Sequence, residues 1–137
     1  MSQLIGFMQG RLCNQVDKRI QAFPWNDWQH EFASAASMNI HVMEWTLDQE
    51  LLYKNPLMNL SGQLRIRSLC SEYNLIIPSL TGDCFMQAPF WKAHGKTRTS
   101  LQADFIAICR ACAEVSIKLV VVPLVDNGSL ELQEQED

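Results

Sequence analysis

The chain has 137 residues, of which 47% are hydrophobic and 19% are charged, a balance that suits one soluble domain with its own core. Its 11 basic and 15 acidic residues give a net charge of −4, which argues against a nucleic-acid partner because phosphate binding needs a basic face. No apolar run approaches the roughly 20 residues of a membrane span, and the five cysteines lack disulfide-framework spacing. We therefore expect a cytoplasmic protein with no membrane partner.

The first predicted strand ends abruptly in polar residues. An apolar run from Leu4 to Met8 is followed by Gln9, Gly10 and Arg11. Parallel α/β proteins place ligand-binding groups at the carboxyl ends of buried strands, so we expect Gln9 and Arg11 to contact a substrate. Arg11 could bind a phosphate through two hydrogen bonds, or it could form an ion pair with an acidic residue at the end of a neighbouring strand.

Strands and helices alternate along the rest of the chain. The predicted helices start at Asn26, Leu60 and about Thr97, and the predicted strands span residues 4–8, 41–45, 75–80 and 117–122. The last of these strands is a continuous aliphatic run, typical of a strand that is covered on both faces. Ser129, with Glu131 behind it, resembles the first turn of a fourth helix. We expect helix ends at Asn39 and at Asn74, which can adopt a left-handed conformation.

This βαβαβαβ order predicts an α/β fold with a parallel sheet and right-handed connections. Two architectures fit the order. One is a series of about four βα units of the TIM-barrel type, which amounts to a half barrel because eight units need about 250 residues. The other is an open doubly wound sheet.

Polar and aromatic residues follow the later predicted strands. Glu44 and Trp45 end the second strand, where the carboxylate could bind a sugar hydroxyl or pair with Arg11. The indole could pack on a sugar ring, although an aromatic residue in a strand usually belongs to the core. Asp83 and Phe85 follow the third strand, and we expect them to line a pocket. Asn127, with Asp126 before it, follows the fourth strand, although Asp and Asn are also ordinary turn residues.

Several motifs together resemble the sugar phosphate isomerase/epimerase family of the xylose isomerase-like TIM-barrel superfamily. The resemblance rests on Gly6–Leu12, Arg19–Pro24, Trp28 with Glu31-Phe32, Glu44-Trp45, Asp83–Met86 and Val122–Asn127. It covers essentially the whole chain in order. The opening motif with the Gln-Ala-Phe-Pro segment is its most specific part.

The resemblance implies a (β/α)8 barrel with a divalent metal of the Mn, Mg or Zn type. Such proteins isomerise or epimerise sugars by moving a proton next to a carbonyl. The family's metal ligands lie on strands five to eight, so we expect residues 1–137 to form one truncated N-terminal half-barrel domain. We expect this chain to hold no metal and to be inactive alone, and its catalytic residues stay unassigned.

Two other functions remain open on the sequence alone. The chain could be a non-catalytic half-barrel that forms a homo-oligomer or complements a separate C-terminal half, because a half-barrel exposes two unpaired edges. Abasic-site endonucleases share the superfamily, but they use histidines at strand ends. Here those ends carry Gln9, Glu44, Asp83 and Asp126, so a sugar or sugar phosphate is the favoured partner.

Overall fold

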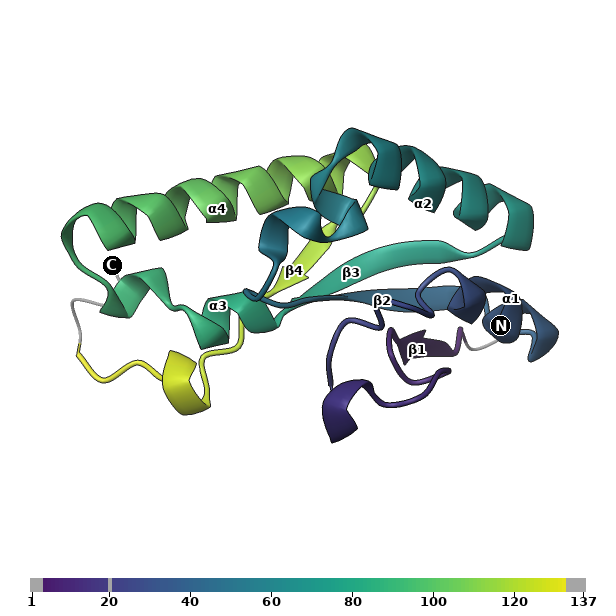
Figure 1. The fold of residues 1–137 in the computed structure, drawn as a ribbon, viewed down its shortest axis with the longest axis horizontal. Coiled ribbons are helices and arrows are strands. Elements are labelled where there is room, and N and C mark those ends of the chain that lie inside the picture. The colour runs from purple at the N-terminus through teal and green to yellow at the C-terminus, as the bar shows by residue number, and fades with distance from the viewer. Residues whose placement is uncertain (1–3, 20, 133–137) are drawn as a thin grey trace.

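The computed structural model of the protein describes residues 4–19 and 21–132, and it is an α/β fold built on one parallel sheet (Figure 1). The strands pair in chain order, as β1, β2, β3 and β4. The strands are β1 (Gly6–Met8), β2 (Val42–Leu47), β3 (Ile76–Gly82) and β4 (Leu119–Val121). The helices are α1 (His30–Ser37), α2 (Leu60–Tyr73), α3 (Asp83–Gln87) and α4 (Gly95–Glu114), and short 3-10 turns lie at residues 16–18, 52–54, 56–58, 90–92 and 126–128.

The long helices lie on one side of this sheet. In Figure 1 both α4 and α2 lie above the strands, and Arg67 of α2 donates a hydrogen bond to Glu114 O at the end of α4. Strand β2 sends Met43, Trp45 and Leu47 toward this side, and all three are fully buried. Because side chains alternate along a strand, Glu44 and Thr46 point to the opposite side. The core therefore occupies the space between the sheet and the helices.

The opposite side of the sheet carries apolar side chains that remain exposed. We call it the uncovered face. On this face Ile76 lies beside Val42, Leu119 beside Ser79, and Val121 beside Thr81. The exposed fractions are 56% for Ile76, 64% for Leu119 and 45% for Val121. The expectation that the 117–122 run is covered on both faces is therefore wrong for the described residues, because only the helix side of β4 has a covering layer.

Helix α2 follows the sequence prediction at both ends. Its first turn is capped by Asn59, whose Oδ1 accepts a hydrogen bond from Gly62 N at 2.8 Å. It closes at Asn74, which adopts a left-handed conformation with φ of 48°. Gly62 is required for close packing, since a Cβ there would lie 2.0 Å from Pro56 O. Local capping and packing thus fix this helix.

The predicted start of α1 is wrong. Residues 24–28 form a turn in which Asp27 N and Trp28 N both donate to Pro24 O, at 3.0 and 2.8 Å. The helix begins only at His30, and Asn26 does not cap it. Because Pro24 O already accepts from the Asp27 and Trp28 N–H groups, Asn26 has no helix N-terminus to cap.

The remaining elements differ more modestly from prediction. The loop expected at residues 86–96 contains the end of α3 and a 3-10 turn, and α4 starts at Gly95. Ser129 closes a 3-10 turn instead of opening a helix, and residues 130–132 are not helical, so the predicted helix start is wrong; residues 133–137 lie outside the described residues. Within the described ranges, no helix has both the length and the apolar character needed to cross a membrane.

Replacing Asn59 tests the assignment of the α2 cap. Asn59→Ala should lower the free energy of unfolding by about 1 kcal/mol, because Gly62 N loses its acceptor. The matched control is Asn26→Ala, which should change stability by less than about 0.5 kcal/mol because the exposed Asn26 caps nothing. Chemical denaturation of both variants measures the difference. Equal losses would contradict the assignment.

Candidate functional site

Gln9 ties the end of β1 to β2. Its backbone N donates to Glu44 O at 2.9 Å, and its side-chain Oε1 accepts from Thr46 N at 3.1 Å. The Thr46 hydroxyl donates back to Gln9 O at 3.2 Å. The side chain is 1% exposed, and its Nε2 finds no hydrogen-bond partner within the described residues. A buried donor in this state costs stability unless a water or a bound group accepts from it.

Glu44 does not end its strand. Strand β2 continues to Leu47, which places Glu44 in mid-strand on the uncovered face. Its carboxylate accepts a hydrogen bond from Ser79 Oγ at 2.6 Å and another from the Thr81 hydroxyl. These two hydroxyls come from β3, where Ser79 pairs with Glu44 in register. Glu44 is therefore a half-buried acid held by hydroxyl donors rather than by a cation.

Asp48 is the residue that follows β2. It is buried, and its Oδ2 accepts from Phe23 N at 3.0 Å while its Oδ1 accepts from Gln87 Nε2 at 2.9 Å. Phe23 belongs to the loop after β1, and Gln87 ends α3 after β3. One carboxylate thus connects the segments that follow three consecutive strands.

Asp83 follows β3 and lies near the other two acids. Its Oδ2 accepts from Gln21 Nε2 at 2.6 Å. Burial raises the pKa of the Asp83 carboxyl above its usual range, and the charges of Asp48 and Glu44 raise it further against the opposing hydrogen bond from Gln21. Asp48 and Asp83 directly follow β2 and β3, and Glu44 lies within β2, close enough for its charge to act on Asp83. We call these three residues the strand-end acids, after the two that follow strands.

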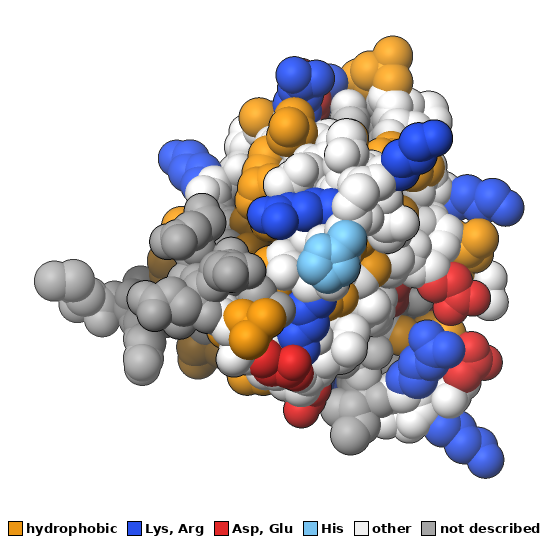
Figure 2. All heavy atoms as spheres, turned by 90° about the vertical axis from the view of Figure 1, so that its left-hand side faces the viewer, with side chains coloured by type: hydrophobic (Ala, Val, Ile, Leu, Met, Phe, Trp, Pro, Cys, Tyr) orange, Lys and Arg blue, Asp and Glu red, His pale blue; other side chains and the backbone are white. Residues whose placement is uncertain are grey.

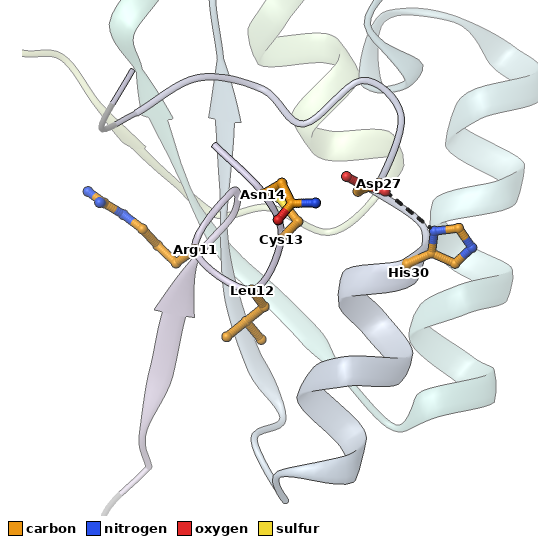
Figure 3. A pocket seen from close by; sticks show the side chains of 6 residues that line it. All are labelled: Arg11, Leu12, Cys13, Asn14, Asp27 and His30. Carbon is orange, nitrogen blue, oxygen red and sulfur yellow. Dashed lines mark ion pairs between the residues drawn. The ribbon is translucent and has the colours of Figure 1, made fainter. Parts of the chain in front are cut away.

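Arg11 stands apart from the strand-end acids. It is exposed, and it forms no ion pair with any described residue, so the pairing considered from the sequence is not found there. It borders a hollow of about 400 Å³ whose other side carries Asp27 and His30, 3.8 Å apart. Figure 3 shows the Arg11 side chain pointing away from that pair. Arg11 is thus free to meet a group from outside.

Glu31 fixes the loop that carries Arg11. It is fully buried, and its Oε1 accepts from Gly10 N at 2.8 Å and Leu12 N at 3.1 Å. Gly10 has φ of +91°, a conformation that favours glycine. Burial raises the pKa of Glu31 despite these hydrogen bonds, and burial with the nearby Glu31 charge raises the pKa of Cys13 to about 11. The Cys13 thiol is therefore protonated at neutral pH and is a poor nucleophile.

Two aromatic residues predicted for the site lie in the core. Trp45 has no exposed surface and packs edge-on against Trp28, with ring centroids 5.8 Å apart, and against Phe23 at 5.5 Å. Phe85 is 4% exposed and packs on Phe105 at 5.2 Å. Neither ring presents a surface to a sugar. The burial of Trp45 follows from strand alternation. Glu44 points to the uncovered face, so the next residue, Trp45, points to the helix side of β2.

Asn127 has a structural contact. It is exposed, and its Nδ2 donates to Met86 O at 2.9 Å, which ties the segment after β4 to α3.

Figure 2 looks onto the side of the molecule that lies at the left in Figure 1. On that side the Lys and Arg side chains are spread out, and acidic side chains lie at the lower centre and the lower right. This view contains no patch of a single charge.

Sequence reasoning missed Asp48, Thr46 and Gln21. The signal for the first two was present, because Thr46 and Leu47 continue the strand alternation and move its end to Asp48. Gln21 contacts Asp83 across 62 positions of sequence, which no local pattern can indicate. Among the described residues, no group of three or more His, Cys, Asp or Glu side chains is placed to hold a metal ion.

Comparison with known proteins adds no relative. The chain matches no family model, and no curated protein is significantly similar to it.

Removal of the Glu31 carboxylate tests its role in the loop. Glu31→Ala should lower the free energy of unfolding by about 2–4 kcal/mol, since Gly10 N and Leu12 N lose their acceptor inside the protein. Glu72→Ala, at an exposed position of α2, is the control and should change stability by less than about 0.5 kcal/mol. Similar stabilities for the two variants in thermal and urea unfolding would show that the loop does not depend on Glu31.

The raised pKa of Asp83 predicts a pH-dependent stability difference. A carboxyl whose folded pKa lies above its ordinary value destabilises the fold progressively as the pH rises through that folded pKa. Asp83→Asn keeps an oxygen for Gln21 and cannot ionise, so it should be more stable than the wild type at neutral pH. The gap should close in acid, where Asp83 is protonated. A variant that is less stable at neutral pH would contradict this account.

Proposed function

We propose that this chain binds a sugar or sugar phosphate at the carboxyl ends of its strands, in the manner of a metal-dependent sugar isomerase or epimerase. The observation that carries the proposal is the group of strand-end acids with amide and hydroxyl groups around it. A sugar offers alternating donors and acceptors, and such a mixture of carboxylate, amide and hydroxyl groups complements it. Gln9 Nε2 adds a donor that has no partner in the described residues.

The strand order supports the TIM-barrel form of this proposal over the doubly wound alternative. Doubly wound sheets contain a point at which the strand order reverses, and their ligands bind there. The order β1-β2-β3-β4 has no such point within the described residues. We therefore interpret the four units as a half-barrel, with the uncovered face corresponding to the interior of a barrel.

Asp83 is the best candidate for moving a proton. Isomerisation of a sugar requires a base to remove a proton from the carbon next to the carbonyl and an acid to return it to the neighbouring carbon. A carboxyl whose pKa is raised by burial and by two neighbouring acids is a stronger base than an ordinary aspartate. Arg11, exposed at the end of β1, is placed to meet a phosphate group.

The metal that the resemblance implies does not fit the described residues by themselves. The strand-end acids are occupied by backbone and side-chain donors, and they are not arranged as a metal-binding group. A Mn, Mg or Zn type ion would need further ligands. We propose that this chain alone has little or no turnover.

A second candidate is a non-catalytic half-barrel that acts through assembly with itself or with a separate C-terminal half. The exposed Leu119 and Val121 on the uncovered face favour this candidate. Under either candidate we propose a cytoplasmic location, in keeping with five free cysteines. A chain that assembles with itself or with a C-terminal half but binds no sugar would favour the second candidate.

Titration of ketoses, aldoses and their phosphates against the protein tests sugar binding. We expect millimolar or tighter binding to the wild type and at least about tenfold weaker binding to Asp83→Asn. Because the same variant should be more stable at neutral pH, weaker binding could not be assigned to unfolding. Glu72→Gln is the control and should bind as the wild type does. Absence of binding to every sugar tested would refute the proposal.

A further inference from the structure

Strand β4 forms one edge of the sheet. Its only neighbouring strand within the described residues is β3. Lys118 N donates to Pro78 O at 3.0 Å, and in a parallel ladder every second N–H turns to the same neighbour. The N–H groups of Leu119 and Val121 therefore point toward the free edge. An edge of this kind is a template for another strand.

Exposed apolar residues lie at both edges of the sheet. Leu119 and Val121 lie on the uncovered face at β4, and their register partners on β3 are Ser79 and Thr81. The exposed Ile76 lies on the same face near the start of β3, beside Val42. At the opposite edge, Leu4 and Ile5 lead into β1 and are 78% and 68% exposed. Pairing with a further strand at each edge would cover these exposed apolar residues.

We propose that two copies of this chain close around a two-fold axis, with β4 of each copy pairing in parallel with β1 of the other. The four strands of each copy are parallel and in chain order, so β1 of a second copy continues the sheet beyond β4 with the same direction and keeps its helices outside. The resulting eight strands are the number at which a parallel barrel closes around its own side chains. The uncovered faces then become the shared interior.

Charge complementarity at the carboxyl ends of the edge strands supports this pairing. Arg11 follows β1 and Asp126 follows β4, and both side chains are exposed. Pairing β4 with β1 of the second copy brings these opposite charges to the same end of the joined strands, twice in the dimer. The pairing does not depend on sugar binding, so it can fail or succeed independently of the proposed function.

The mass in solution tests the dimer. Light scattering and sedimentation of the wild type should give twice the chain mass of 15.6 kDa at micromolar concentration. Val121→Lys should raise the dissociation constant at least about 100-fold, because it places a charge in the shared interior. The control Leu64→Lys, at an exposed position on α2, should leave the dimer intact. A monomer at all concentrations, or a dimer insensitive to Val121→Lys, would overturn the proposal.

A charge exchange tests which edges meet. Arg11→Asp should weaken the dimer about three- to tenfold, and adding Asp126→Arg should restore most of the loss. Face-to-face stacking of two sheets, or pairing with a separate C-terminal half, would leave the two substitutions uncoupled in the homodimer. Additive effects in this cycle would therefore overturn the β4-to-β1 pairing, while near-complete rescue would support it.

Discussion

Right-handed connection of parallel strands is the constraint on which this structure depends. When each crossover is right-handed and the strands follow one another in order, every crossover helix lies on the same side of the sheet. The opposite side is then left without a layer of helices, and the carboxyl ends of the strands lie at the same end of the sheet. Both properties of the molecule, the uncovered face and the convergence of polar groups after the strands, follow from this one rule.

The uncovered face explains how acids are kept inside a small α/β domain. Glu44 would be intolerable on the helix side of β2, where Met43, Trp45 and Leu47 pack. On the other side it receives hydroxyls from Ser79 and Thr81 and keeps some contact with solvent. The cost of charge is higher at Asp83, where burial raises the pKa. An ionised Asp83 therefore makes the protein less stable than it could be, a cost that is common at residues that bind a ligand.

The sequence predicted most reliably what local chemistry decides. The bounds of α2 were correct, because Asn59, Gly62 and Asn74 satisfy the helix ends by contacts within the segment. The start at Asn26 failed because a turn onto Pro24 competes for the same region. The contacts of Gln21 with Asp83 and of Glu31 with the β1 loop join distant segments, so no periodicity could indicate them. The aliphatic run at β4 predicted a second covering layer that the described residues do not contain.

The exchange rates of the Leu119 and Val121 amide hydrogens test most directly whether the uncovered face and its edge are sites of assembly. Both N–H groups point to the free edge of β4, so their protection depends on whether another strand pairs there. Our account predicts slow exchange at high protein concentration and faster exchange on dilution, while the Val120 amide, turned toward β3, stays protected throughout. Rapid exchange of both edge amides at every concentration would contradict it.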